Sequence, residues 1–173
     1  MVTEGGPLGA TFNIGGVTVP VDAASGNGET GLRVYMRNHI WCSFVVIQNT
    51  DAGTTDDIAV DLREHNASTG GTSQDLDIIT EYHVQSETAL DGDETWSTTT
   101  QSAASEISAI AGTAELELVL VVSVHQDQLS DGFDWLSLDI ANLGSTDTQF
   151  TAIIPILTGL QVQRKPANLA VTQ

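Results

Sequence analysis

The chain has 173 residues, which is enough for one domain that buries most of its apolar surface without disulfides or bound metal. Asp and Glu number 23 against 5 Lys and Arg, so the formal net charge is −18 at pH 7. Such a charge repels phosphate, and we therefore expect no nucleic acid partner. The longest apolar stretch, Leu116 to Val124, is about half the length of a membrane-spanning helix, so we expect no membrane partner either.

The acidic balance is accompanied by a scarcity of lysine, because Lys165 is the single lysine of the chain. This composition suggests a protein adapted to a high-salt environment, where a Debye length of about 3 Å at 1 M salt screens carboxylate repulsion. Two alternatives stay open: an acidic protein that is merely soluble, and one shaped to sit on a basic partner.

Short runs rich in Val, Ile, Thr and aromatic residues recur between clusters of Gly, Asn, Asp and Ser, which is typical of a β-sandwich or barrel. We predict an all-β fold, an antiparallel β-sandwich of jelly-roll-like or Greek-key type. Residues 65–74 are predicted to be a polar loop, and 105–111 fit a short helix or a strand. In chain order, the predicted strands are 10–14, 17–21, 32–36, 39–48, 57–63, 76–84, 94–101, 115–124, 133–140 and 149–157.

Two of these segments, 39–48 and 115–124, are apolar on both faces for much of their length. This pattern predicts central strands that are buried on both sides. Along the whole chain, we predict a sandwich domain over 22–159, preceded by an N-terminal arm with the first strands over 1–21 and followed by a C-terminal extension over 160–173. The two flanking segments are candidate bridging arms, although the C-terminal one is equally well explained as a frayed end.

Several motifs could carry chemistry, and the residues around them argue against it. Gly26 to Gly31 has the letters of a dinucleotide-binding loop but leads into a strand-like segment, whereas that motif requires a helix. Asp91 to Glu94 and Asp127 to Asp134 are acid-dense turns without the ligand order of a calcium loop, so we interpret them as solvated loops. The four histidines lack a partner at the spacing of a metal or hydrolase motif, and each is predicted at a strand end or on the surface; they are His39, His65, His83 and His125.

The remaining candidates also favour structural roles. Cys42 lies in an apolar strand and is predicted to be a small core residue, not a nucleophile. The glycosylation sequon at Asn66 to Ser68 falls in a predicted surface loop and carries little weight. Core packing is the simplest explanation for the aromatic residues Trp41, Trp96, Phe133 and Trp135. We therefore predict no catalytic, cofactor-binding or metal-binding residues and no cofactor.

Three segments carry a resemblance to a known family: Asn38 to Ile47, Ile58 to Leu62, and above all Gln128 to Asp139 with its Gly-Phe-Asp-Trp core. From about Leu32 to Leu157 the chain resembles small head-associated and capsid-decorating structural proteins of tailed viruses. The resemblance implies a β-sandwich subunit located on the virion, with the major capsid protein and other copies of itself as partners. The chain departs from the family pattern in its acidity and in continuing through Gln161 to Gln173.

The sequence therefore predicts a non-enzymatic virion protein that decorates the capsid surface and stabilises the particle. A turret, spike or tail component built on the same sandwich is one alternative. A carbohydrate- or host-surface-binding module is another, and an exposed aromatic cluster around Trp41, Trp96 or Trp135 would favour it. A deep polar pocket joining His83 or His125 to a Ser and an Asp would instead favour an enzyme.

Overall fold

The computed structural model describes residues 12–23, 30–50, 59–108, 117–141 and 149–160. These residues form twelve strands and one short 3₁₀ turn, η1 (Gln126–Gln128). None of the described segments is a helix long and apolar enough to cross a membrane. The strands are β1 (Phe12–Ile14), β2 (Thr18–Asp22), β3 (Val34–Tyr35), β4 (Trp41–Thr50), β5 (Val60–His65), β6 (Ser73–Asp75), β7 (Ile79–Glu87), β8 (Ser97–Ala104), β9 (Glu106–Ile107), β10 (Glu117–His125), β11 (Trp135–Ile140) and β12 (Gln149–Thr158).

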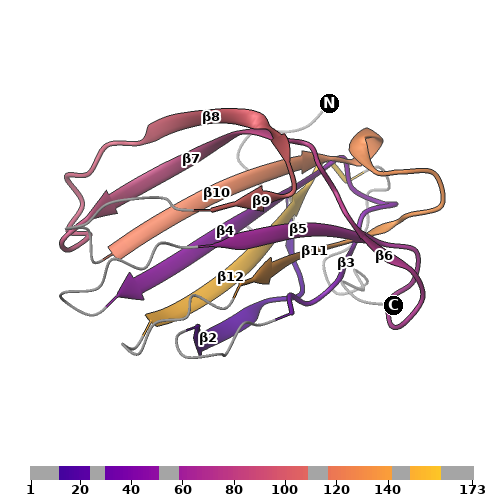
Figure 1. Ribbon diagram of the computed structural model, residues 1–173, viewed down its shortest axis with the longest axis horizontal. Helices are drawn as coiled ribbons and strands as arrows, with labels where there is room; N and C mark the ends of the chain where they lie inside the picture. Colours follow the sequence, from indigo (N-terminus) through magenta and orange to yellow (C-terminus); the bar gives the residue numbers. More distant parts are fainter. Residues whose placement is uncertain (1–11, 24–29, 51–58, 109–116, 142–148, 161–173) are drawn as a thin grey trace.

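The strands form two antiparallel sheets that pack face to face, so the predicted all-β sandwich is confirmed (Figure 1). The larger sheet has seven strands in the order β1-β12-β4-β10-β7-β8, with β2 also pairing with β12. The smaller sheet has the order β3-β11-β5-β6, with β9 pairing with β5. Because β4 pairs with β10 and β12, which are remote in sequence, the centre of the larger sheet depends on long-range contacts.

The core lies between the two sheets and follows from alternation along each strand. Phe44 and Val46 of β4 and Leu120 and Val122 of β10 are almost fully buried, whereas the residues between them face away from the core. The smaller sheet contributes Leu62 of β5 from the opposite side. Further core side chains are Val34, Met36, Cys42, Val60, Ile107, Val124, Leu136, Leu138, Ile140, Ile153 and Leu157.

Two predictions about individual segments need correction. The predicted loop 65–74 includes Ser73 and Gln74, which together with Asp75 form β6 and pair with β5 at the sheet edge. The strands β4 and β10 are central, as predicted, but only one face of each packs on the core, so the prediction of burial on both faces is wrong.

The expected arms lie only partly within the described residues. The described part of 1–21 is integrated into the larger sheet, because β1 and β2 both pair with β12. The expected extension over 160–173 lies outside the described residues after Leu160. Of 105–111, Glu106 and Ile107 form the short strand β9, so the strand alternative holds there.

Candidate interaction surface

The side of the larger sheet that faces away from the core is apolar across its three central strands. Antiparallel registers place Val45 of β4 between Val121 of β10 and Ile154 of β12, and Ile47 between Val119 and Ala152. Antiparallel sheets with one solvated side normally present polar residues there. We define the outer face as Trp41, Ser43, Val45, Ile47, Val119, Val121, Ser123, His125, Ala152, Ile154, Ile156 and Thr158.

These twelve side chains include no Asp, Glu, Lys or Arg, although the chain carries 23 acidic residues. Charge returns at one end of the same side, where Glu117 of β10 lies opposite Asn49 and accepts a hydrogen bond from it at 3.3 Å. Ile14 extends the apolar character onto β1, where it lies opposite Ile156. The chemistry changes toward the other edge, because β7 and β8 present His83, Gln85 and a Ser/Thr-rich strand. Depletion of charge at the centre of a patch is the composition expected of a buried protein interface.

A hollow of about 300 Å³ opens where β4, β7 and β10 lie next to η1. The indole ring of Trp41 contacts the ring of His125 edge to face, with 4.6 Å between the ring centroids. His83 and Glu81 line the hollow from β7, and Ser123 lines it from β10. The hollow therefore combines one exposed aromatic ring with hydrogen-bonding groups.

The prediction that the tryptophans serve core packing is wrong for Trp41 and Trp96 and confirmed for Trp135. Trp41 is 43% exposed and Trp96 is 53% exposed. Trp135 is buried and contacts Tyr35 in a tilted arrangement, with ring centroids 4.8 Å apart and 42° between the ring planes. Phe133 is half-buried. Sequence patterning missed Trp41 because both sides of its strand are apolar, so alternation could not tell which side meets the core.

The hollow lacks the feature that would identify a hydrolase. The Ser123 hydroxyl hydrogen-bonds the Ser43 hydroxyl at 2.8 Å, and not a histidine. His125 Nδ1 accepts the Asp127 backbone N–H at 3.2 Å. His83 Nδ1 shares a hydrogen bond of 3.0 Å with the Thr98 hydroxyl. Among the described residues at this place, no Ser–His hydrogen bond is formed that could activate a nucleophile.

A serine–histidine contact does occur in the smaller sheet, where it is buried. His65 shares hydrogen bonds with the Ser73 hydroxyl at 2.7 Å and with the Ser137 hydroxyl at 2.9 Å. Ser137 in turn donates to Asp139 Oδ1 at 3.0 Å. The Asp139 carboxylate thus orients the serine, whereas in a hydrolase triad the carboxylate orients the imidazole. His65 and Ser137 are also both buried from solvent.

The expectation of strand-end or surface positions is confirmed for His65, His83 and His125 and wrong for His39. His65 ends β5 but is only 2% exposed, and desolvation, aided by the Arg33 and Arg63 charges, lowers its pKa to about 4. His39 lies in the turn before β4 and is also buried, which lowers its pKa. His125 ends β10 and His83 lies exposed within β7, in agreement with the prediction.

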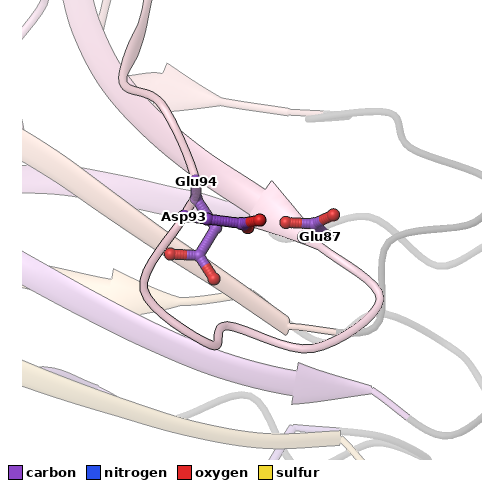
Figure 2. A group of neighbouring side chains, drawn as sticks. All are labelled: Glu87, Asp93 and Glu94. Carbon is purple, nitrogen blue, oxygen red and sulfur yellow. The ribbon is translucent and has the colours of Figure 1, made fainter.

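The acid-dense turn between β7 and β8 brings three carboxylates together, from Glu87, Asp93 and Glu94 (Figure 2). Their oxygens lie within 4.8 Å of one another. The backbone N–H groups of Asp91 and Gly92 donate to the Glu94 carboxylate and lower its pKa, whereas the Asp93 charge raises the pKa of Glu87. Glu94 therefore acts as the acceptor that closes its own turn, and we assign no metal to the cluster.

The other sequence candidates are not brought together. The chain after Gly31 continues into β3 and not into a helix, so the dinucleotide motif lacks its structural context. In the second acidic turn, Asp134 pairs with Arg37 at 2.9 Å. The sequon residue Asn66 is exposed and accepts the Thr72 N–H. Cys42 is a buried core residue, as predicted.

No family model, curated protein or solved structure matches the chain.

Proposed function

We propose that the chain is a structural subunit of a virus particle that decorates the capsid surface and stabilises it in a high-salt environment. The observation that supports this proposal best is the uncharged outer face of the larger sheet. The sequence resemblance between Leu32 and Leu157 is the reason for proposing the major capsid protein as the partner. The role is assembly without turnover.

The charge distribution supports docking through the outer face. A subunit with a net charge of −18 repels other copies and acidic partners across most of its surface. The centre of the outer face, away from Glu117, is where a second protein can approach without desolvating carboxylates. High salt screens the remaining repulsion, so copies can be neighbours on a lattice.

Repetition makes a modest docking surface sufficient. Many copies on a symmetric shell, each contacting the shell and its neighbours, gain avidity without a strong single contact. We therefore expect a homo-oligomer on the particle, with the outer face turned toward the capsid.

The first test is a copy count in purified particles by quantitative mass spectrometry against the major capsid protein, with imaging of the location. A number near one per capsid protein, or one per symmetry-related capsid site, supports decoration. A few copies per particle would instead favour a turret, spike or tail position. Absence from particles would contradict a virion role.

The second test examines the outer face with a matched pair of variants. Ile154→Glu places a charge at the centre of the outer face, and Thr100→Glu places one on the polar edge strand β8 of the same sheet. Both purified proteins are added to particles stripped of the native subunit. We expect Thr100→Glu to rebind normally and Ile154→Glu to lose rebinding while keeping its circular dichroism spectrum. Equal rebinding would show that another surface docks.

A further inference from the structure

The hollow beside Trp41 has the volume of a small-molecule site and lies at one edge of the outer face, with which it shares Trp41, Val121, Ser123 and His125. Its volume of about 300 Å³ lies at the lower end of the range for ligand sites, about 300–1,000 Å³. Trp41, at 43% exposed, is available to a ligand. The walls come from β4, β7, β10 and η1, including Ile78, Val121 and Gln128.

The hydrogen-bonding groups of the hollow are held in place before any ligand arrives. His125 is fixed by its contact with the Trp41 ring and by the Asp127 N–H that its Nδ1 accepts. In the neutral ring, the proton is therefore on Nε2, which makes that atom a donor. The side-chain oxygen of Gln128 accepts the backbone N–H of His125 at 2.7 Å, so this side chain is also held.

The β7 wall offers both a carboxylate and an imidazole. His83 Nδ1 is engaged by Thr98, and its Nε2 lies 3.7 Å from the Glu81 carboxylate. Glu81 and His83 are both exposed, so the remaining acceptor capacity of the carboxylate faces solvent. The hollow thus presents a flat apolar ring beside donors and acceptors on rigid strands.

We propose that this hollow binds a neutral saccharide. A pyranose ring has an apolar face of C–H groups that packs on an indole, and hydroxyl groups around its rim that both donate and accept hydrogen bonds. The Glu81 carboxylate can accept from two neighbouring hydroxyls, and the His125 Nε2–H can donate to a third. These are the groups that the hollow supplies.

The carboxylate of the site selects the class of saccharide. Glu81 in the wall disfavours sialylated, sulfated or uronic sugars, because carboxylates in contact repel each other at distances that molar salt, with a Debye length of about 3 Å, screens only in part. The same charge disfavours nucleotides, which would otherwise stack on Trp41. This activity goes beyond lattice docking. Because the hollow shares residues with the outer face, a subunit docked through that face would cover it, so the sugar site belongs to the free subunit.

The test is a titration of the purified full chain with disaccharides in molar KCl, in which saturation-transfer NMR measures binding. The probes are lactose, mannobiose and N,N′-diacetylchitobiose, with sialyllactose as the acidic counterpart. We expect at least one neutral disaccharide to bind and sialyllactose to bind at least about tenfold more weakly than lactose. If none of the three neutral disaccharides binds, or if sialyllactose binds better, the proposal is overturned.

The tryptophans provide a matched pair of variants. Trp41→Ala removes the ring from the hollow, and Trp96→Ala removes an equally exposed ring that does not line it. We expect Trp41→Ala to weaken binding about tenfold or more, and Trp96→Ala to leave it unchanged. Equal losses in the two variants, or full binding by Trp41→Ala, would contradict the site.

A second variant distinguishes a loss of binding from a folding defect in Trp41→Ala. Glu81→Gln changes an exposed side chain without changing its size, so the fold is retained. We expect it to weaken binding of the neutral disaccharide several-fold, about 3–10-fold, because a charged acceptor becomes a neutral amide. Unchanged affinity in this variant would remove Glu81 from the site and overturn the charge argument.

Discussion

His65 and Ser137 are joined across the β5–β11 pair by a hydrogen bond of 2.9 Å between Nε2 and the hydroxyl oxygen. Since Ser137 donates its own proton to Asp139, the His65 Nε2–H donates to Ser137, and Nδ1 accepts from Ser73. This arrangement of donors fits a neutral imidazole. Protonation would turn Nδ1 into a donor toward the Ser73 hydroxyl, which already accepts from Arg33, and would add a charge near Arg33 and Arg63.

This relationship predicts acid destabilisation through His65. The folded-state pKa of about 4 lies below the ordinary value of 6.5, so the unfolded chain binds more protons between these values. The contribution is fully present above pH 6.5 and declines as the pH falls toward 4. We expect up to about 2 kcal/mol of unfolding free energy to be lost between pH 6.5 and 5, since one pKa unit is worth about 1.4 kcal/mol.

The measurement is chemical denaturation across this pH range in molar salt, compared with His65→Gln. The variant cannot titrate at this position, so the wild type should lose more stability than the variant as the pH falls. Parallel pH profiles for the two proteins would show that His65 does not carry the effect.

The two sides of β4 predict opposite responses to truncation. Phe44 is almost fully buried in the core, whereas Ile47 lies on the outer face and is 43% exposed. We expect Phe44→Ala to lower the free energy of unfolding by about 3–5 kcal/mol through lost burial and a cavity. Ile47→Ala should cost less than about 1 kcal/mol in the isolated subunit. Urea denaturation measures both, and similar losses would contradict the assignment of the two faces.

The sequence predicted the central strands well because their long apolar runs carry a strong signal. The predicted segments 39–48 and 115–124 became β4 and β10, with shifts of one or two residues at their ends. By contrast, β6 is three polar residues that are strand only because β5 pairs with them. Its partner is a tertiary contact that local patterning does not contain.

The candidate sites were less predictable for a related reason. The hollow needs Trp41, His83 and His125 from three strands, and their proximity follows from the pairing of β10 with β4 and β7. The outer face was visible in sequence as residues apolar on both sides of a strand. Which of the two sides meets the core depends on the register of strand pairing, and the residues of one strand do not determine that register.

The burial of Cys42 predicts a thiol that does not react in the native protein. It is completely buried in β4, and desolvation raises the pKa of its thiol far above the ordinary range, so the reactive thiolate is suppressed. We expect no reaction with a water-soluble disulfide reagent in the folded protein and one thiol per chain in denaturant. The absorbance of the thiolate that the reagent releases measures the reaction. Rapid labelling of the native protein would contradict this burial.

The acidic turn allows the proposed salt adaptation to be tested locally. The Asp93 charge raises the pKa of Glu87, so the two carboxylates repel each other in dilute buffer. We expect Asp93→Asn to raise the melting temperature at 0.05 M KCl, where the Debye length lies between about 10 and 30 Å against about 3 Å at 1 M, and to have little effect at 3 M KCl. Asp131→Asn, which removes one exposed carboxylate from a different turn, is the matched control and should give a smaller low-salt gain.

The wild type should itself gain stability with salt. Screening of 23 acidic side chains predicts a melting temperature that rises by more than about 5 °C between 0.1 and 3 M KCl, equivalent to about 1–2 kcal/mol for a chain of this size. Differential scanning calorimetry measures the rise. Sucrose stabilises by exclusion without screening charge, so it should not remove the difference between Asp93→Asn and the wild type, whereas KCl should. A difference that persists in 3 M KCl would mean that Asp93 acts through local packing and that its charge is not what limits stability.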